Sequence, residues 1–193
     1  MSEGELADAD WEVVHELRLR GFIENPDTDR VGIVVASGFA ALRTTKLVIT
    51  PEGRAAHAAW ARCEPGSAAE EGVRRAFDRF LTLNTELLQL CSDWQVKRGG
   101  VANDHGDAAY DWSVIDRLIA LDERAGAVAR HSGTAIGRLV PYRSRLRSAR
   151  SRVENGEHEW FTSPRIDSYH TVWMQWHEDL LLALGLERDV HAR

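Results

Sequence analysis

Four histidines and several carboxylates in the second half of the sequence are residue types that bind metal ions or transfer protons. His105 lies in the polar segment Asn103–Asp107 (NDHGD), and His158 lies in Glu157–Trp160 (EHEW). A third group falls within three turns of one expected helix and comprises Asp167, His170, His177 and Glu178. Imidazole nitrogens and carboxylate oxygens are suitable ligands for zinc, iron or another divalent ion. A metal-dependent or acid–base enzyme is therefore one hypothesis.

The spacing of these histidines matches no common metal-binding motif. His170 and His177 are roughly 10 Å apart along a helix, whereas imidazoles four residues apart share one ion more readily. The alternative interpretation is structural: Asp107 caps a helix, His158 caps or packs at a turn, and His170 bonds to a neighbour. The sequence leaves the identity of any cofactor or metal open.

Seven tryptophans, beside only five phenylalanines, suggest a second kind of site. Aromatic walls with a few polar groups are typical of pockets for small organic molecules, although helical cores use the same residues. Four tryptophans are candidates for such walls: Trp112, Trp160, Trp173 and Trp176. The ligand site expected for a small-molecule effector comprises His105, Trp112, His158, Trp160, Asp167, His170, Trp173 and His177.

The segments that hold these residues have helical periodicity. Apolar residues recur every three or four positions in four stretches: 68–95, 108–130, 132–153 and 164–184. Asn84 interrupts the first stripe and indicates a kink or a break, and Pro141 disturbs the start of the third. Helices with matching stripes can bury one another, so a bundle of about four helices is predicted for residues 65–193.

The first 64 residues are predicted to form a separate, smaller unit. The turn-rich stretch Glu64–Ser67 (EPGS) separates it from the helices that follow. Residues 10–23 have helical spacing and Thr28 or Asp29 begins a second helix, whereas the β-branched Gly32–Val35 is predicted as a strand. The whole chain is thus expected to be mainly α, with a short β element.

A short strand at Leu47–Thr50 is followed by a helix that begins at Pro51. Thr50 can cap this helix and Pro51 suits its first position, so the helix is predicted to run to about Cys63. The sequence Ile49-Thr50-Pro51-Glu52-Gly53-Arg54 resembles the leucine-threonine-proline-x-glycine-arginine pattern of winged helix-turn-helix regulators of the MarR type. This resemblance covers residues 8–63 and implies a DNA-binding homodimer, since two-fold symmetric operators need two reading heads.

The resemblance places the recognition helix at Ser37–Lys46 (SGFAALRTTK). The side chains expected to face DNA are Ser37, Arg43, Thr44, Thr45 and Lys46. Only Glu24–Ile49 remains for a second helix, a recognition helix and a wing. The unit is therefore either a compressed winged helix or a module that has lost DNA binding and serves a protein partner.

The composition limits these hypotheses. A formal net charge of -6 argues against non-specific coating of nucleic acid, but permits a regulator with a local basic patch. One such patch is the face shared by Arg143, Arg147 and Arg150, which suits an anionic ligand, an acidic partner or surface ion pairs.

Apolar runs are too short for a membrane span of about 18 residues, and the acidic start differs from a signal peptide. Cys63 and Cys91 are too few for a disulfide framework, so a cytoplasmic location is expected. The favoured function is a DNA-binding transcriptional regulator whose helical unit senses a ligand or forms a dimer. An enzyme is the less favoured alternative.

Overall fold

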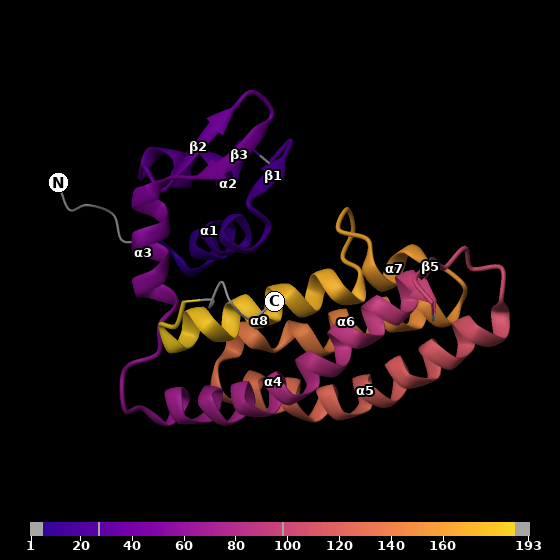
Figure 1. The fold of residues 1–193 in the computed structure, drawn as a ribbon. Helices are drawn as coiled ribbons and strands as arrows, with labels where there is room; N and C mark the ends of the chain where they lie inside the picture. Colours follow the sequence, from indigo (N-terminus) through magenta and orange to yellow (C-terminus); the bar gives the residue numbers. More distant parts are fainter. Residues whose placement is uncertain (1–5, 27, 98, 188–193) are drawn as a thin grey trace. The chain divides into compact units, whose positions relative to one another are not determined.

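The computed structural model of the chain describes residues 6–26, 28–97 and 99–187 (Figure 1). The protein is mainly helical with a small antiparallel sheet, which confirms the predicted fold class. It divides into two compact units, Met1–Arg62 with Leu181–Arg193, and Cys63–Leu180. The sequence pattern did not indicate that the chain from Leu181 groups with the first unit. None of the helices in the described part of the chain is long and apolar enough to cross a bilayer.

The first unit alternates helices and short strands. Its elements are α1 (Asp8–Arg20), β1 (Phe22–Glu24), α2 (Thr28–Ala36), β2 (Ala40–Arg43), β3 (Lys46–Ile49) and α3 (Pro51–Ala61). The sheet is antiparallel with the order β1-β3-β2. Val14, Leu17, Val34 and Leu47 are fully buried and form the centre of its core. The sheet and the helices therefore share one apolar interior.

Two sequence predictions for this unit are wrong. Gly32–Val35 belongs to α2 and not to a strand, because Val34 is buried against the core at a helical position and packing overrides β propensity. The segment Ser37–Lys46 forms no recognition helix. Gly38 follows α2 with a φ of 78°, and β2 and β3 then form a hairpin whose turn contains Thr44 with a φ of 57°.

The predicted start of α3 is confirmed. The Thr50 hydroxyl accepts a hydrogen bond of 2.9 Å from the Gly53 N–H, and Pro51 occupies the first helical turn. Gly53 also lies against the backbone of Phe39, where a Cβ atom would be only 2.0 Å from the Phe39 carbonyl oxygen. The glycine of the Thr-Pro-Glu-Gly sequence is thus required by a close approach of two backbone segments.

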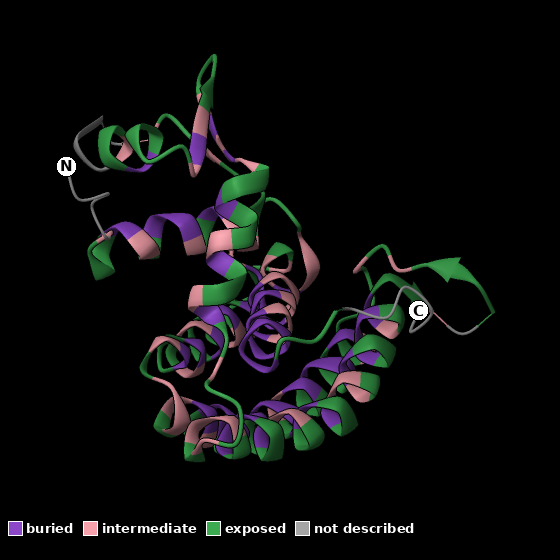
Figure 2. Cartoon of the chain, turned by 90° about the vertical axis from the view of Figure 1, so that its left-hand side faces the viewer, coloured by how far each residue is buried: buried purple, intermediate pink, exposed green. Residues whose placement is uncertain are grey.

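The second unit is built from long helices. Its elements are α4 (Ala68–Gln95), β4 (Val96–Lys97), β5 (Val101–Ala102), α5 (Ala108–Ala135), the 3-10 helix η1 (Gly137–Leu139), α6 (Pro141–Glu154), α7 (Glu159–Thr162) and α8 (Tyr169–Leu184), the last to Leu180 only. The antiparallel helices α4 and α5 are joined by the β4–β5 hairpin (Figure 1). The helices bury one side and expose the other, as the sequence stripes predict (Figure 2).

The structure corrects three details of the predicted helices. Asn84 does not interrupt α4; its side-chain oxygen accepts a 2.9 Å hydrogen bond from the Trp173 indole nitrogen. Pro141 does not disturb a helix, because it occupies the first turn of α6. Backbone N–H groups in a first turn make no intrahelical hydrogen bond, so proline, which has none, is tolerated there. The last helix begins at Tyr169, so Asp167 precedes it.

Candidate metal centre

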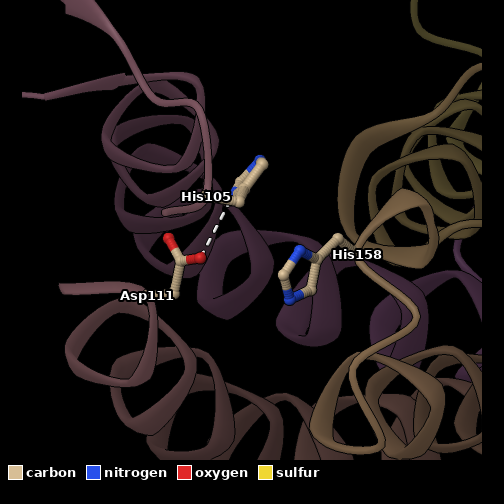
Figure 3. A group of neighbouring side chains, drawn as sticks. All are labelled: His105, Asp111 and His158. Carbon is tan, nitrogen blue, oxygen red and sulfur yellow. Dashed lines mark hydrogen bonds and ion pairs between the residues drawn. The ribbon is translucent and has the colours of Figure 1, made fainter. Parts of the chain in front are cut away.

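Three side chains from separate segments of the second unit converge on one point. His105 comes from the loop before α5, Asp111 from the start of α5, and His158 from the residue before α7. One nitrogen or oxygen atom from each can be chosen so that all lie within 4.8 Å of one another. Figure 3 shows the two rings and the carboxylate around a common space. Among the described residues, these form the one cluster of three His, Cys, Asp or Glu side chains able to share an ion.

Local hydrogen bonds fix the loop that carries His105. The Asn103 side-chain oxygen accepts from the His105 N–H at 3.1 Å, and His105 adopts a left-handed φ of 58°. Asp104 accepts from the Gly106 N–H, and this hydrogen bond, followed by the ion pair with Lys97, lowers the pKa of the Asp104 carboxyl. Asp107 caps α5 by accepting from two backbone N–H groups, as predicted. The loop therefore holds His105 in a conformation that non-glycine residues rarely adopt.

Asp111 orients the His105 ring. Its carboxylate is buried and lies 3.0 Å from His105 Nδ1, while Asn103 donates to its second oxygen at 2.8 Å. A carboxylate only accepts hydrogen bonds, so His105 Nδ1 is the donor in this contact. The second N–H of Asn103 donates to the Trp94 carbonyl at 3.0 Å. Asn103 therefore links the Asp111 carboxylate to the backbone at the end of α4.

Aromatic rings enclose the two histidines. The Trp94 ring centroid lies 4.5 Å from that of His105 and 5.4 Å from that of His158, and the two imidazole centroids are 4.8 Å apart. The Trp94 side chain is itself buried. His158 occupies the N-cap position of α7 but makes no side-chain capping hydrogen bond. Of the two structural roles expected for it, capping or packing at a turn, the structure shows packing against Trp94 and His105.

A small cavity of about 90 Å³ adjoins the cluster. It is lined by His105, Asp111 and His158, and also by Trp112 and Glu154. Pockets for organic ligands usually have volumes of at least about 300 Å³, so this cavity suits an ion with a few water molecules better than a bulky effector. A divalent ion with three protein ligands keeps positions for water and lowers the pKa of that water, which is the chemistry of hydrolytic metal sites.

The other sequence-predicted ligand residues lie elsewhere in the unit. Trp160 stacks on the Arg152 guanidinium at 4.2 Å, and Asp167 pairs with Arg145 at 3.1 Å. Trp173 is fully buried against Phe80, and the His177 ring also contacts Phe80. His170 is half-buried, and its burial lowers the pKa of the imidazole. Of the eight expected residues, His105, Trp112 and His158 line the cavity.

Four of the five residues expected to face DNA lie at the turn of the β2–β3 hairpin. Arg43, Thr44 and Thr45 are exposed at its turn. Lys46 is 3.3 Å from Glu24 and its ammonium group lies 4.0 Å above the Phe22 ring. Ser37 is exposed just after α2, and its hydroxyl donates to the Val34 carbonyl.

Sequence reasoning missed Asp111, the buried member of the cluster. The sequence contains a signal for it, because Asp111 follows the cap residue Asp107 by about one helical turn and therefore lies on the same face of α5. It also missed the contact in the first unit between His15 and His57, whose ring nitrogens are 2.9 Å apart. Comparison of the chain with protein-family models, with curated proteins and with solved structures gives no match.

Proposed function

We propose that the second unit binds a divalent transition-metal ion through His105, Asp111 and His158. The observation that carries this proposal is the convergence of two imidazoles and a buried carboxylate, from three separate segments, beside a small cavity. Nitrogen and carboxylate donors of this kind suit zinc, iron, cobalt or nickel better than calcium or magnesium. The cavity leaves room for water on the ion, which distinguishes the arrangement from a closed structural site.

The distance between His105 and Asp111 suits a shared ion. With bonds of about 2.0 to 2.1 Å, two donor atoms 3.0 Å apart subtend an angle of about 90° at the metal. Were an ion held by His105 Nδ1 and Asp111, the proton of the neutral His105 ring would lie on Nε2. Two donors on one tetrahedral ion are about 3.4 Å apart, so a separation of up to 4.8 Å within the cluster must shorten by about 1.4 Å for all three residues to hold the ion.

Metal titration of the chelator-treated full chain tests this proposal. We expect one equivalent of Zn²⁺ to bind, and His105→Ala or His158→Ala to weaken that affinity at least about 100-fold, because each removes a direct ligand. The measurement is competition with a chromophoric chelator, with Co²⁺ absorption as a second readout of the coordination number.

His170→Ala is the matched control, because His170 is a half-buried histidine of the same unit outside the cluster. This variant should bind zinc with unchanged affinity. Absence of stoichiometric binding, or an equal loss in His170→Ala, overturns the proposal. Circular dichroism of each variant separates loss of a ligand from loss of the fold.

We propose DNA binding by the first unit as a second candidate function. The observation that favours it is the element order α1-β1-α2-β2-β3-α3 with sheet order β1-β3-β2, in which an exposed hairpin turn carries Arg43, Thr44 and Thr45. On α2 the exposed side chains include the apolar Ile33 and Val35. The hairpin turn supplies hydrogen-bond donors that suit phosphate contacts. The proposed DNA-binding form is a homodimer, since two-fold symmetric operators need two reading heads. Its proposed location is the cytoplasm, and the two free cysteines agree with a reducing compartment.

Fluorescence anisotropy with a labelled 30-base-pair duplex at low salt tests the second function. We expect Arg43→Ala to weaken binding several-fold, because one phosphate contact is lost. Arg54→Ala, an exposed arginine on α3 in the same unit, should change little. No binding even at low salt, or equal effects of the two substitutions, would exclude this role for the hairpin.

A further inference from the structure

A second cavity lies at the opposite end of α5 from His105. It has a volume of about 570 Å³ and lies between the last turns of α5 and the start of α6. Asp111 and Gly133 are on the same helix, roughly 30 Å apart at 1.5 Å per residue, so this groove is separate from the candidate metal centre. Its volume falls within the range of about 300 to 1,000 Å³ that small organic ligands occupy.

Three arginines line the groove: Arg130, Arg143 and Arg147. Arg143 donates to both oxygens of the buried Asp122 carboxylate, at 3.0 and 3.1 Å, so its charge is compensated. Arg130 and Arg147 are exposed, and no ion pair within the described part of the chain includes either of them. The positions four residues before and after Arg130 are Gly126 and Thr134, and those around Arg147 are Arg143 and Ser151, so no carboxylate neutralises them along their own helices.

The rest of the groove is mainly small or apolar. Gly133 lies so close to Val140 that an added Cβ would be 3.1 Å from the Val140 backbone and side chain. Val140 is 58% exposed and Pro141 follows it at the start of α6. No side chain caps the N-terminus of α6, so the positive end of its dipole adds to the two uncompensated guanidinium groups. An apolar surface thus lies beside a concentrated positive charge.

We propose that this groove binds an organic anion, a carboxylate or phosphate monoester on an apolar body. The head group contacts Arg130 and Arg147, because guanidinium forks match carboxylate and phosphate oxygens in pairs. The apolar body lies against Val140, Pro141 and the glycine surface. The overall charge of -6 does not favour general binding of anions, so selectivity comes from this local arrangement.

Calorimetric titration of the full chain with three probes of one shape tests the proposal. We expect 2-naphthoate or 2-naphthyl phosphate to bind at least about tenfold more tightly than the neutral 2-naphthalenemethanol, because only the anions pair with the arginines. The tighter of the two anions identifies the head group. Arg130→Gln combined with Arg147→Gln should remove this preference, and addition of a metal chelator should leave it unchanged.

Arg79→Gln is the matched control, since Arg79 is an exposed arginine on α4 outside the groove. This variant should bind both anions as the unchanged chain does. Equal affinity for the neutral and anionic probes, or an equal loss in Arg79→Gln, overturns the proposal. Because all three substituted arginines are exposed or line the open groove, circular dichroism should show an unchanged fold.

Discussion

Replacement of Asp122 by alanine is expected to lower the free energy of unfolding by about 3 kcal/mol, since it removes the buried carboxylate to which Arg143 and Tyr169 donate and leaves Arg150 with Glu154 alone. The Asp122 carboxylate is 1% exposed and lies 3.0 Å from Arg143 and 3.2 Å from Arg150. The Tyr169 hydroxyl donates to it at 3.2 Å. Burial and the neighbouring Asp122 charge raise the pKa of Tyr169 well above its usual value, so tyrosine stays a donor here. Urea denaturation followed by circular dichroism measures the loss.

Asp116→Ala is the control for this prediction. Asp116 is an exposed aspartate on the same helix, and its removal should change stability by less than about 0.5 kcal/mol. A loss below about 1 kcal/mol for Asp122→Ala would mean that Arg143 and Arg150 regain water when the carboxylate is removed. The network would then contribute little to stability.

Gly53→Ala should destabilise the first unit by about 3 kcal/mol or more, because the new methyl group has no space and its neighbour is backbone. The added Cβ would be 2.0 Å from the Phe39 carbonyl oxygen, which also accepts a 3.0 Å hydrogen bond from the Thr50 N–H. Relief of the clash must separate β2 from the start of α3. Hydrogen exchange of the backbone amides measures this change within the first unit alone.

Gly32→Ala provides the opposite expectation in the same unit. Gly32 is an exposed position of α2, and a Cβ atom added there meets nothing within 4 Å. Alanine favours the helix over glycine by about 0.5 to 1 kcal/mol, so this variant should be slightly more stable. Equal protection of the backbone amides in Gly53→Ala and Gly32→Ala would contradict the prediction, because it would mean that the backbone at Phe39 moves away from the new methyl group at no cost in stability.

The sequence predicts the long helices well because each carries its own periodic signal. The boundaries of α4 follow from a stripe that repeats over the whole segment, and Thr50 and Pro51 mark the start of α3 directly. The first unit was harder to predict. The valines of α2 favour a strand locally, and it is the burial of Val34 in the core of the first unit that fixes this segment as a helix.

The candidate metal centre was predictable in part. His105 and His158 are conspicuous in polar segments, but nothing local shows that their rings meet. Their approach depends on how α5 and α6 pack and on the turn before α7, which are long-range properties of the chain. Asp111 was overlooked because an acidic residue near a helix start is ordinarily explained by the helix dipole.

The three metal-ligand candidates are unevenly distributed along the chain. His105 and Asp111 are six residues apart, and Asn103 hydrogen-bonds near both of them. His158 follows α5 and α6 in the chain, so it approaches the other two only when those helices are packed. An unfolded chain offers no such trio, so an ion that binds here favours the folded state by mass action. The midpoint temperature of thermal unfolding should therefore rise with zinc concentration. The fraction of chains that hold zinc would then report whether the helices of the second unit are packed together.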